Sequence, residues 1–315
     1  MSGSAAVLGG EAAAAVARLR EELAASRQRL DVLSASSARA RKLARLIGRL
    51  GERVALPPRI VLLGEFNSGK TTLANALIGA DVLPTSIHAN TRLPLHVRHS
   101  AEPTLAVELA DGSRRVLTEA TFQLLAGGQA RMLHVGLPVE RLRLFELIDT
   151  PGLASGMTRI DGGNLAACAR ANIAIWCTAS TQAWKATERT AWTAVPARLR
   201  KRSLLVATLA DTLNTDRDRA RVEARLRGET QSIFGELAMV AAAEVDELRR
   251  NPGAAEFAER WVASGGERLD ALVLGIVEQV LAGREAATRR VLGRAAARLG
   301  AGDSGGGDRG RERVA

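Results

Sequence analysis

The sequence is poor in cysteine, tyrosine and long apolar runs, and each shortage excludes a class of protein. Two cysteines in 315 residues are too few for a disulfide scaffold or for a zinc site built from cysteine ligands. Aromatic residues make up only 3% of the chain and tyrosine is absent, which argues against a surface of rings that stacks on nucleic-acid bases. No segment reaches the ~18 consecutive apolar residues of a membrane-spanning helix, and the first residues lack the basic start of a secretory signal. The expected location is therefore cytoplasmic, either free or peripheral at the inner face of the membrane.

The rest of the composition is that of a globular protein with an excess of basic residues. Hydrophobic residues make up 46% and charged residues 25% of the chain, so it is long and apolar enough to fold around its own core. The formal net charge of +10 favours acidic partners: a membrane surface, nucleic acid or the phosphates of a nucleotide. A GC-rich coding genome would produce the same excess of arginine without any such partner.

Two long helical patterns flank the centre of the chain. From residue 11 to about residue 50, apolar residues recur at three-, four- and seven-residue spacings and so share one helical face. A second pattern covers residues 266–300. We predict that residues 1–56 form a flexible start and a helix, that the two helices pack as a short neck, and that residues 301–315 form a disordered tail. A membrane-surface role for the first helix stays open, because its end is crowded with basic residues: Arg39, Arg41, Lys42, Arg45, Arg49 and Arg53.

Between these helices the sequence alternates between strand and helix patterns. Short apolar runs predict strands at residues 59–64, 92–99, 104–109, 114–117, 131–135, 142–148, 172–178, 203–208 and 238–242. Periodic patterns predict helices at residues 70–78, 183–195 and 215–234. Strands that alternate with helices indicate an α/β domain with a mainly parallel central sheet and flanking helices, over about residues 57–265.

A phosphate-binding loop follows the first predicted strand. Residues 64–71 read Gly-Glu-Phe-Asn-Ser-Gly-Lys-Thr, the G-x-x-x-x-G-K-T pattern of a P-loop. The glycines let backbone N–H groups point inward, and the following helix adds the positive end of its dipole. Lys70 would reach the β- and γ-phosphates, and the hydroxyl of Thr71 would bind Mg²⁺. The predicted fold class is an α/β P-loop NTPase, whose loop supplies these nucleotide-binding residues: Gly64, Asn67, Ser68, Gly69, Lys70, Thr71 and Thr72.

A second motif of this kind lies further along the chain. Asp149-Thr150-Pro151-Gly152 follows the strand predicted at residues 142–148. An aspartate at the carboxyl end of a strand can hold Mg²⁺ through a water molecule, and Gly152 can present its backbone N–H to the γ-phosphate. A D-x-P-G sequence at this distance from a P-loop is the usual second signal of a GTPase.

Two segments resemble the GTPase domain of the bacterial dynamin family. They read GEFNSGKTTLANALIG and DVLPTSIHANTRLPLHVR, and the resemblance covers residues 57–213 well and residues 214–265 loosely. It implies a domain that binds GTP, hydrolyses it to GDP and phosphate, and forms a homodimer across the nucleotide site. By the family pattern Thr91 is the switch threonine, which coordinates Mg²⁺ and senses the γ-phosphate, so it is expected to be catalytic along with Lys70.

The guanine-recognition motif is the weakest part of the resemblance. The family has Asn/Thr-Lys-x-Asp, whereas this chain has Thr208-Leu209-Ala210-Asp211. Asp211 can still accept hydrogen bonds from N1 and N2 of guanine, which adenine cannot donate. Leu209 replaces the lysine whose stem packs along the base. We expect weaker affinity with the preference for guanine retained, unless Asp211 merely caps the following segment.

Two positions bear on hydrolysis. Leu153 stands where Ras-like enzymes carry a water-orienting glutamine; dynamin relatives also lack that glutamine. Asn67 occupies the position of an asparagine that helps to coordinate K⁺ in GTPases similar to Era and TrmE. We hypothesise that Asn67 is catalytic and holds K⁺ as a second cofactor beside Mg²⁺. The alternative is an Asn67 side chain that bonds the backbone of its own loop.

Two other functions stay open from the sequence. One is a GTP-switched RNA- or ribosome-associated factor of the Era kind, which the basic charge supports and the scarcity of aromatic residues opposes. The other is a non-hydrolysing module in which GTP holds the neck in one state. The candidate partners are thus GTP or GDP, a second copy of the chain, a membrane surface or a partner protein, with nucleic acid less favoured.

Several chemically capable residues give no predicted site. His96 and His99 are spaced H-x-x-H, but on a strand this spacing places them on opposite faces, so no metal site is expected. Trp184 and Trp192 lie eight residues apart and are expected to share one face of a helix in the core. The two cysteines, Cys168 and Cys177, have no activating partner in sequence and are expected to be inert.

Overall fold

The computed structural model describes residues 38–82, 93–118, 129–153 and 162–303, with six positions between 18 and 28. The chain divides into two compact units: Pro57–Val277, and Met1–Leu56 with Glu278–Ala315. Among the described residues, no helix combines the length and the apolar character needed to cross a bilayer. The tail predicted at residues 301–315 lies outside the described residues from 304 onward, and residues 301–303 still belong to the last helix.

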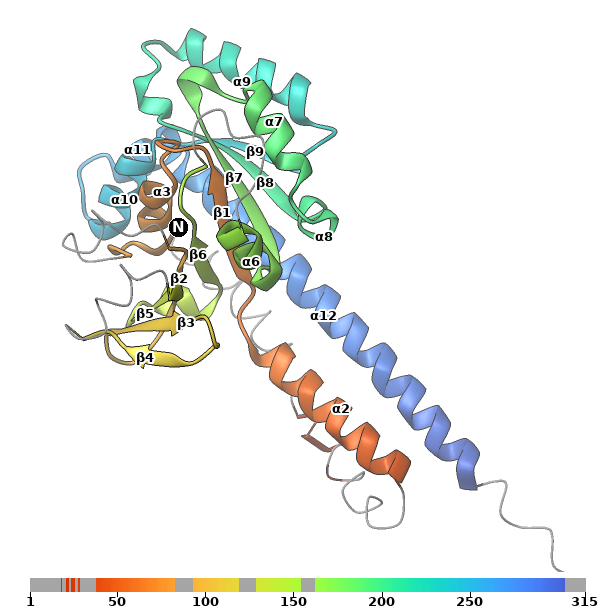
Figure 1. Ribbon diagram of the computed structural model, residues 1–315. Coiled ribbons are helices and arrows are strands. Elements are labelled where there is room, and N and C mark those ends of the chain that lie inside the picture. Colours follow the sequence, from red (N-terminus) through yellow and green to blue (C-terminus); the bar gives the residue numbers. More distant parts are fainter. Residues whose placement is uncertain are drawn as a thin grey trace, which may run out of the picture. The chain divides into compact units, whose positions relative to one another are not determined.

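A nine-stranded mixed sheet forms the centre of the first unit (Figure 1). Its strands run in the order β4-β3-β5-β2-β6-β1-β7-β8-β9. The strands are β1 (Arg59–Gly64), β2 (Leu95–His99), β3 (Thr104–Leu109), β4 (Arg114–Val116), β5 (Ala130–Leu137), β6 (Glu146–Asp149), β7 (Ile173–Ala179), β8 (Ser203–Thr208) and β9 (Glu236–Met239). Five of the eight ladders are parallel and three are antiparallel. The predicted α/β fold with a mainly parallel sheet is confirmed.

Helices cover both faces of this sheet (Figure 1). One face carries α6 (Gly162–Arg170), α7 (Ala186–Thr193), α8 (Ala197–Arg200) and α9 (Asp216–Thr230). The other face carries α3 (Lys70–Ile78), α10 (Ala242–Arg250), α11 (Phe257–Ala263) and the start of α12 (Gly266–Asp303). After its first residue, Arg59, the central strand β1 is apolar and buried from residue 60 to residue 64, which explains why this part of its sequence is a continuous apolar run rather than an alternating one.

A half-buried cluster of charged side chains fixes the end of α3. The Arg249 guanidinium donates to the carbonyl of Ala76 at 2.6 Å and to Asp270 of α12 at 2.7 Å. Arg141, from the short turn η1 (Glu140–Arg143), donates to the carbonyl of Leu77 at 2.6 Å and also to Asp270. Burial lowers the pKa of Arg141 to about 10, so it stays charged. These arginines satisfy the last carbonyls of the helix that begins at the phosphate loop.

Several predicted elements have other bounds in the structure: β2 begins at residue 95 rather than 92, and α9 ends at residue 230 rather than 234. The predicted strand at 142–148 is wrong in its first half: Leu142 lies in η1, buried, and β6 begins only at Glu146. A run of apolar residues indicates that the segment is buried, but it does not distinguish a buried strand from a buried turn. The predicted strand at 238–242 is β9, at 236–239, and α10 begins at Ala242. The predicted helix at 183–195 is α7, which begins only at Ala186.

The late start of α7 changes the account of the tryptophans. Trp184 precedes the helix and has a φ of 60°, so it does not share a helical face with Trp192. Both rings are nevertheless in the core, where they contact Phe234 at centroid distances of 5.1 Å and 4.4 Å. The prediction that both tryptophans lie in the core is therefore confirmed, but the prediction that they share one helical face is wrong.

The second unit contains α2 (Ala38–Ala55) and the later part of α12. Within α2, Ala44, Ile47 and Val54 are buried. Within this unit, Arg284 donates to the carbonyl of Leu56 at 2.6 Å, so the two segments that form the unit are in contact here. Of the basic residues predicted to crowd the end of the first helix, four are exposed in the structure: Arg41, Lys42, Arg45 and Arg49.

Candidate functional site

The loop between β1 and α3 has the conformation that its glycines predict. Gly64 has a φ of 147° and Gly69 a φ of 73°, and both values favour glycine. A Cβ on Gly64 would lie 2.2 Å from the carbonyl oxygen of Cys177 in β7, so no larger residue fits there. Asn67, at the crest, also has a positive φ, of 60°, and is exposed; asparagine is the commonest non-glycine residue in this region.

Lys70 is buried inside this loop at the first position of α3. Its ammonium donates to the carbonyls of Glu65 at 2.6 Å and Gly64 at 3.1 Å, and lies 3.3 Å from the hydroxyl of Ser68. The side chain is 6% exposed. Burial lowers the pKa of Lys70 from its usual value, and the nearby acidic groups oppose that shift. The loop therefore holds a cation at the centre of its backbone cradle.

Thr71 and Asp149 bring two oxygen ligands together beside that cation. The Thr71 hydroxyl donates to a carboxylate oxygen of Asp149 at 2.7 Å, although the residues lie 78 positions apart. Asp149 ends β6, which runs parallel to β1, and the Thr150 hydroxyl donates to the Leu62 carbonyl at 2.6 Å and fixes this register. A hydroxyl and a carboxylate at one point are a donor set that suits Mg²⁺.

The segment after Asp149 packs directly on the phosphate loop. Leu153 donates its N–H to the carbonyl of Gly64 at 3.1 Å and accepts from Phe66 at 2.9 Å. A Cβ on Gly152 would lie 2.6 Å from the Cα of Phe66 and 3.2 Å from the Lys70 ammonium. Only glycine allows this approach, so Gly152 places its backbone beside the lysine.

A pocket of about 330 Å³ collects most of the predicted residues. Its lining includes seven of them: Asn67, Gly69, Lys70, Thr71, Thr72, Asp149 and Gly152. Gly64 and Ser68 belong to the loop but do not line the pocket. Thr91 lies in the segment 83–92, outside the described residues. Leu93 and Leu95, which follow that segment, do line the pocket.

The predicted base-recognition residues lie at the other side of the loop. The hydroxyl of Thr208, at the end of β8, donates to the carbonyl of Ser68 at 2.7 Å. Thr208 therefore stabilises the phosphate loop. Leu209 has a φ of 56° and starts the turn η3 (Ala210–Thr212), which leaves Asp211 exposed. Neither Thr208 nor Asp211 lines the 330 Å³ pocket.

Sequence reasoning missed a support for the phosphate loop. The buried carboxylate of Glu65 accepts from the Lys185 ammonium at 2.9 Å and from the Thr187 hydroxyl at 2.6 Å. Burial raises the pKa of Glu65, but the hydrogen bonds from Thr187 and Lys185 outweigh it, and the net shift is downward. The partners lie about 120 residues away at the start of α7, and no local pattern connects them. An acidic residue inside a phosphate loop was the one available signal, because its charge needs a cationic partner there.

Replacing Glu65 by glutamine is expected to weaken nucleotide binding by roughly three- to tenfold, since a hydrogen bond to a charged group contributes about 1.5 kcal/mol or more. The glutamine side chain has the same shape as glutamate but lacks the negative charge that attracts the Lys185 ammonium. The backbone of the loop at residues 64–65 is therefore held less firmly in place. Titration calorimetry with Mg²⁺-GDP measures the effect, with Lys201→Met, an exposed lysine at the end of α8, as the control. An unchanged dissociation constant in Glu65→Gln would show that the contact has no part in binding.

The surroundings of both cysteines disfavour the reactive thiolate. Both thiols are buried, and burial raises the pKa of Cys168 to about 11 and that of Cys177 to about 12. Among the described residues, no group of three or more His, Cys, Asp or Glu side chains could hold a metal ion.

The strand, the glycine loop, the lysine and the neighbouring carboxylate together define a P-loop nucleoside-triphosphate-binding domain. Residues 60–210 match the model of the Dynamin family. This segment, just under half of the chain, is therefore similar to the GTPase head of that family.

Known proteins similar to this chain agree with that assignment. Dynamin-like protein 2 of Campylobacter jejuni is 38% identical over 99 residues, which are 30% of this chain and 16% of that protein. The isoniazid-induced protein IniC of Mycobacterium tuberculosis is 36% identical over 117 residues, 35% of this chain and 24% of that protein. The matches thus span at most about a quarter of these relatives.

A solved structure shows the same fold. An oligomerised bacterial dynamin pair, described as a mechanism for the long-range sensing and tethering of membranes, superimposes with a TM-score of 0.58. The sequence identity is 14%, and the match covers 92% of this chain and 57% of that one.

Proposed function

We propose that this chain binds GTP with Mg²⁺ and hydrolyses it to GDP and phosphate. The observation that carries the proposal is the contact between the Thr71 hydroxyl and Asp149 next to the buried Lys70 ammonium. Thr71 would hold Mg²⁺ directly and Asp149 would hold it through water, and the ion supplies positive charge to the β- and γ-phosphates. By the family resemblance Thr91 completes this set.

The chain's own groups have distinct tasks in this proposal. Lys70 exchanges the carbonyls of Gly64 and Glu65 for oxygens of the β- and γ-phosphates, so the cation is already in place when the nucleotide arrives. Gly152, which no side chain separates from the loop, offers its N–H to the γ-phosphate. Asp211 accepts from N1 and N2 of guanine and so selects GTP over ATP.

The direct test is phosphate release from GTP and from ATP, measured side by side with Mg²⁺ in K⁺ buffer at several protein concentrations. The proposal requires turnover of GTP well above that of ATP. Equal use of ATP would contradict the assignment of Asp211. Binding of GTP without turnover would replace the hydrolase by a binding module.

We also propose that Asn67 holds K⁺ during hydrolysis. Asn67 is exposed and lines the pocket, and a monovalent cation there would add positive charge near the β–γ bridge. GTP turnover is then expected to be at least about tenfold faster in K⁺ than in Na⁺, and Asn67→Asp to change this ratio. Phosphate release in matched chloride salts gives the ratio, and equal rates in both salts would exclude a K⁺ site.

A homodimer across the nucleotide site and a peripheral position at the inner face of the membrane complete the proposal. The Phe66 side chain supports the homodimer, because this large apolar side chain is 68% exposed beside the pocket, where a second copy could cover it. The position at the membrane is supported by the exposed basic residues of α2: Arg41, Lys42, Arg45 and Arg49. A specific GTPase rate that rises with protein concentration is the result that dimerisation requires. Salt-sensitive sedimentation with anionic vesicles, compared with binding to RNA, separates a membrane partner from a nucleic-acid partner.

A further inference from the structure

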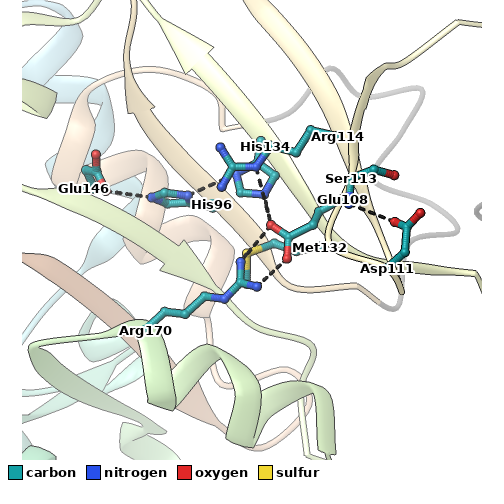
Figure 2. Close-up of polar contacts among 9 residues, drawn as sticks. All are labelled: His96, Glu108, Asp111, Ser113, Arg114, Met132, His134, Glu146 and Arg170. Carbon is teal, nitrogen blue, oxygen red and sulfur yellow. Dashed lines mark hydrogen bonds and ion pairs between the residues drawn. The ribbon is translucent and has the colours of Figure 1, made fainter.

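A row of ionisable side chains crosses six adjacent strands of the sheet. In sheet order it comprises Arg114 of β4, Glu108 of β3, His134 of β5, His96 of β2, Glu146 of β6 and Arg59 of β1. The four central members are 4–7% exposed. Figure 2 shows that they point toward one another along one face, with Arg170 of α6 beside Glu108. Buried charges in such a row are costly unless each is paired.

The contacts along the row are continuous. His96 Nε2 lies 2.9 Å from a Glu146 carboxylate oxygen, and His134 Nε2 lies 2.9 Å from a Glu108 oxygen. The two Nδ1 atoms of the histidines lie 3.1 Å from each other. The ends of the row are closed by arginines. Arg59 donates to Glu146 at 2.7 Å, and Glu108 binds Arg170 and has Arg114 at 3.5 Å.

The carboxylates fix how many protons the histidines carry. The pKa of Glu108 is lowered to about 2, first by its hydrogen bonds from Arg170, and the pKa of Glu146 is lowered to about 2 because His96 and Arg59 together outweigh its burial. Both groups are therefore carboxylates at neutral pH and can only accept, so each histidine must donate through Nε2. The short contact between the two Nδ1 atoms then requires one hydrogen, donated by one ring and accepted by the other.

The surroundings decide which ring is the cation. The pKa of His134 is lowered to about 4: burial is the largest cause, the positive charges of Arg114 and His96 act in the same direction, and Glu108 opposes them. His134 is thus the neutral ring, which accepts at Nδ1. The hydrogen-bond geometry then leaves His96 to donate on both sides, through Nε2 to Glu146 and through Nδ1 to His134.

This proton lies next to the nucleotide pocket, at the junction between strands β2 and β6, which is called the β2–β6 seam below. Strand β2 joins β6 by three residue pairs, and this antiparallel ladder connects the β5–β2 part of the sheet to the β6–β1 part. Leu95, next to His96, lines the pocket and pairs with Asp149. Glu146 lies on the same strand as Asp149. The His96–Glu146 bond therefore fixes the relative position of the two strands that border the pocket.

We propose that His96 and His134 share a single proton that clamps the β2–β6 seam, and that His96, His134 and Glu146 are positioning residues for the bound nucleotide. A second proton would place two N–H groups and two positive rings against each other. Loss of the shared proton would leave two lone pairs in contact, or would cost one carboxylate bond if a ring changed tautomer. Nucleotide affinity is then highest while the pair holds one proton and falls on both the acid and the alkaline side. This link to affinity rests on the proposed nucleotide-binding function.

Two measurements on the full chain test the two parts. Nitrogen NMR of the histidine-labelled protein at neutral pH is expected to show three N–H groups on the four ring nitrogens of His96 and His134, with one cationic ring. Two neutral rings, or two cationic ones, would overturn the shared proton. This readout needs no nucleotide, so it stands even if the chain binds none.

The second measurement is the dissociation constant of Mg²⁺-GDP from about pH 5 to about pH 9. Acidification is expected to weaken wild-type binding about tenfold, which is the effect of a coupling of one pKa unit. His134→Gln keeps an acceptor for His96 and a donor for Glu108, so the acid loss disappears while the alkaline loss stays. The double variant His96→Gln with His134→Gln has no shared proton and is expected to be insensitive to pH.

His99→Gln is the matched control, because it removes a histidine from the same strand whose partner, Glu140 at 3.5 Å, lies outside the row. Its pH profile is expected to match that of the wild type. A double variant that keeps the wild-type profile would overturn the link to affinity. Wild-type protein that binds no Mg²⁺-GDP at any pH would overturn that link and the proposed function together, while NMR would still decide whether the proton is shared.

Discussion

Replacing Lys70 by alanine is expected to lower the affinity for Mg²⁺-GTP by about 100-fold or more and to abolish phosphate release. The ammonium is buried and already bonded within the loop, so it meets the phosphates without losing a hydration shell at that moment. Charge-assisted hydrogen bonds to phosphate contribute roughly 3 kcal/mol in such a site, and about 1.4 kcal/mol corresponds to a tenfold change. Fluorescence titration and phosphate release measure the two losses.

The control for this variant is Lys201→Ala, at an exposed lysine after α8. It removes one positive charge from the same unit without touching the loop. Its affinity and turnover are expected to equal those of the wild type. Hydrolysis retained in Lys70→Ala would contradict the placement of the active site in this loop, because no other group described beside the pocket could replace the cation's role at both phosphates.

Asp211→Asn is expected to reverse the choice of base. Guanine presents two donors, N1–H and the N2 amino group, and a carboxylate accepts from both. An asparagine offers one acceptor and one donor, so its amide N–H meets the guanine amino group. The loss of a charged acceptor and the unpaired donor together should weaken GTP binding about 100-fold. Xanthosine triphosphate carries an oxygen at position 2, which accepts from the new amide, so its binding should improve.

Competition between GTP, xanthosine triphosphate and ATP for the same protein measures this exchange. Asp216→Asn, at an exposed aspartate in the first turn of α9, controls for the change in net charge. The same order of affinities in Asp211→Asn as in the wild type would assign Asp211 to a capping role. The base would then be read by groups other than this carboxylate.

The sequence predicted the phosphate loop well because its signals are local. Glycines at two positions of positive φ, a preceding apolar strand and a following helix all act within residues 59–78. The approach of Asp149 was also predictable, because parallel neighbours of β1 end at the same edge of the sheet. Whether Asp211 and Thr91 act as expected remains a prediction of the family pattern.

The parts that could not be predicted depend on partners far apart in sequence. The Glu65 support joins the loop to α7, and the histidine row requires the register in which His96 lies opposite His134. Periodicity gives the face of each residue but not its cross-strand neighbour. A signal was nevertheless present, since each of four apolar strands carries one His or Glu among buried positions.

The central position of β1 has a consequence for synthesis on the ribosome. Its two neighbours are late in the chain, because Arg59 pairs with Glu146 and Ile60 pairs with Ile173. Strand β1 is therefore made early; both of its edges stay open until β6 has emerged, and one edge stays open until β7 has emerged. Exposed strand edges in nascent chains invite pairing with other chains. Truncation before residue 146 would leave β1 without either neighbour, and such fragments are expected to aggregate when the intact chain does not.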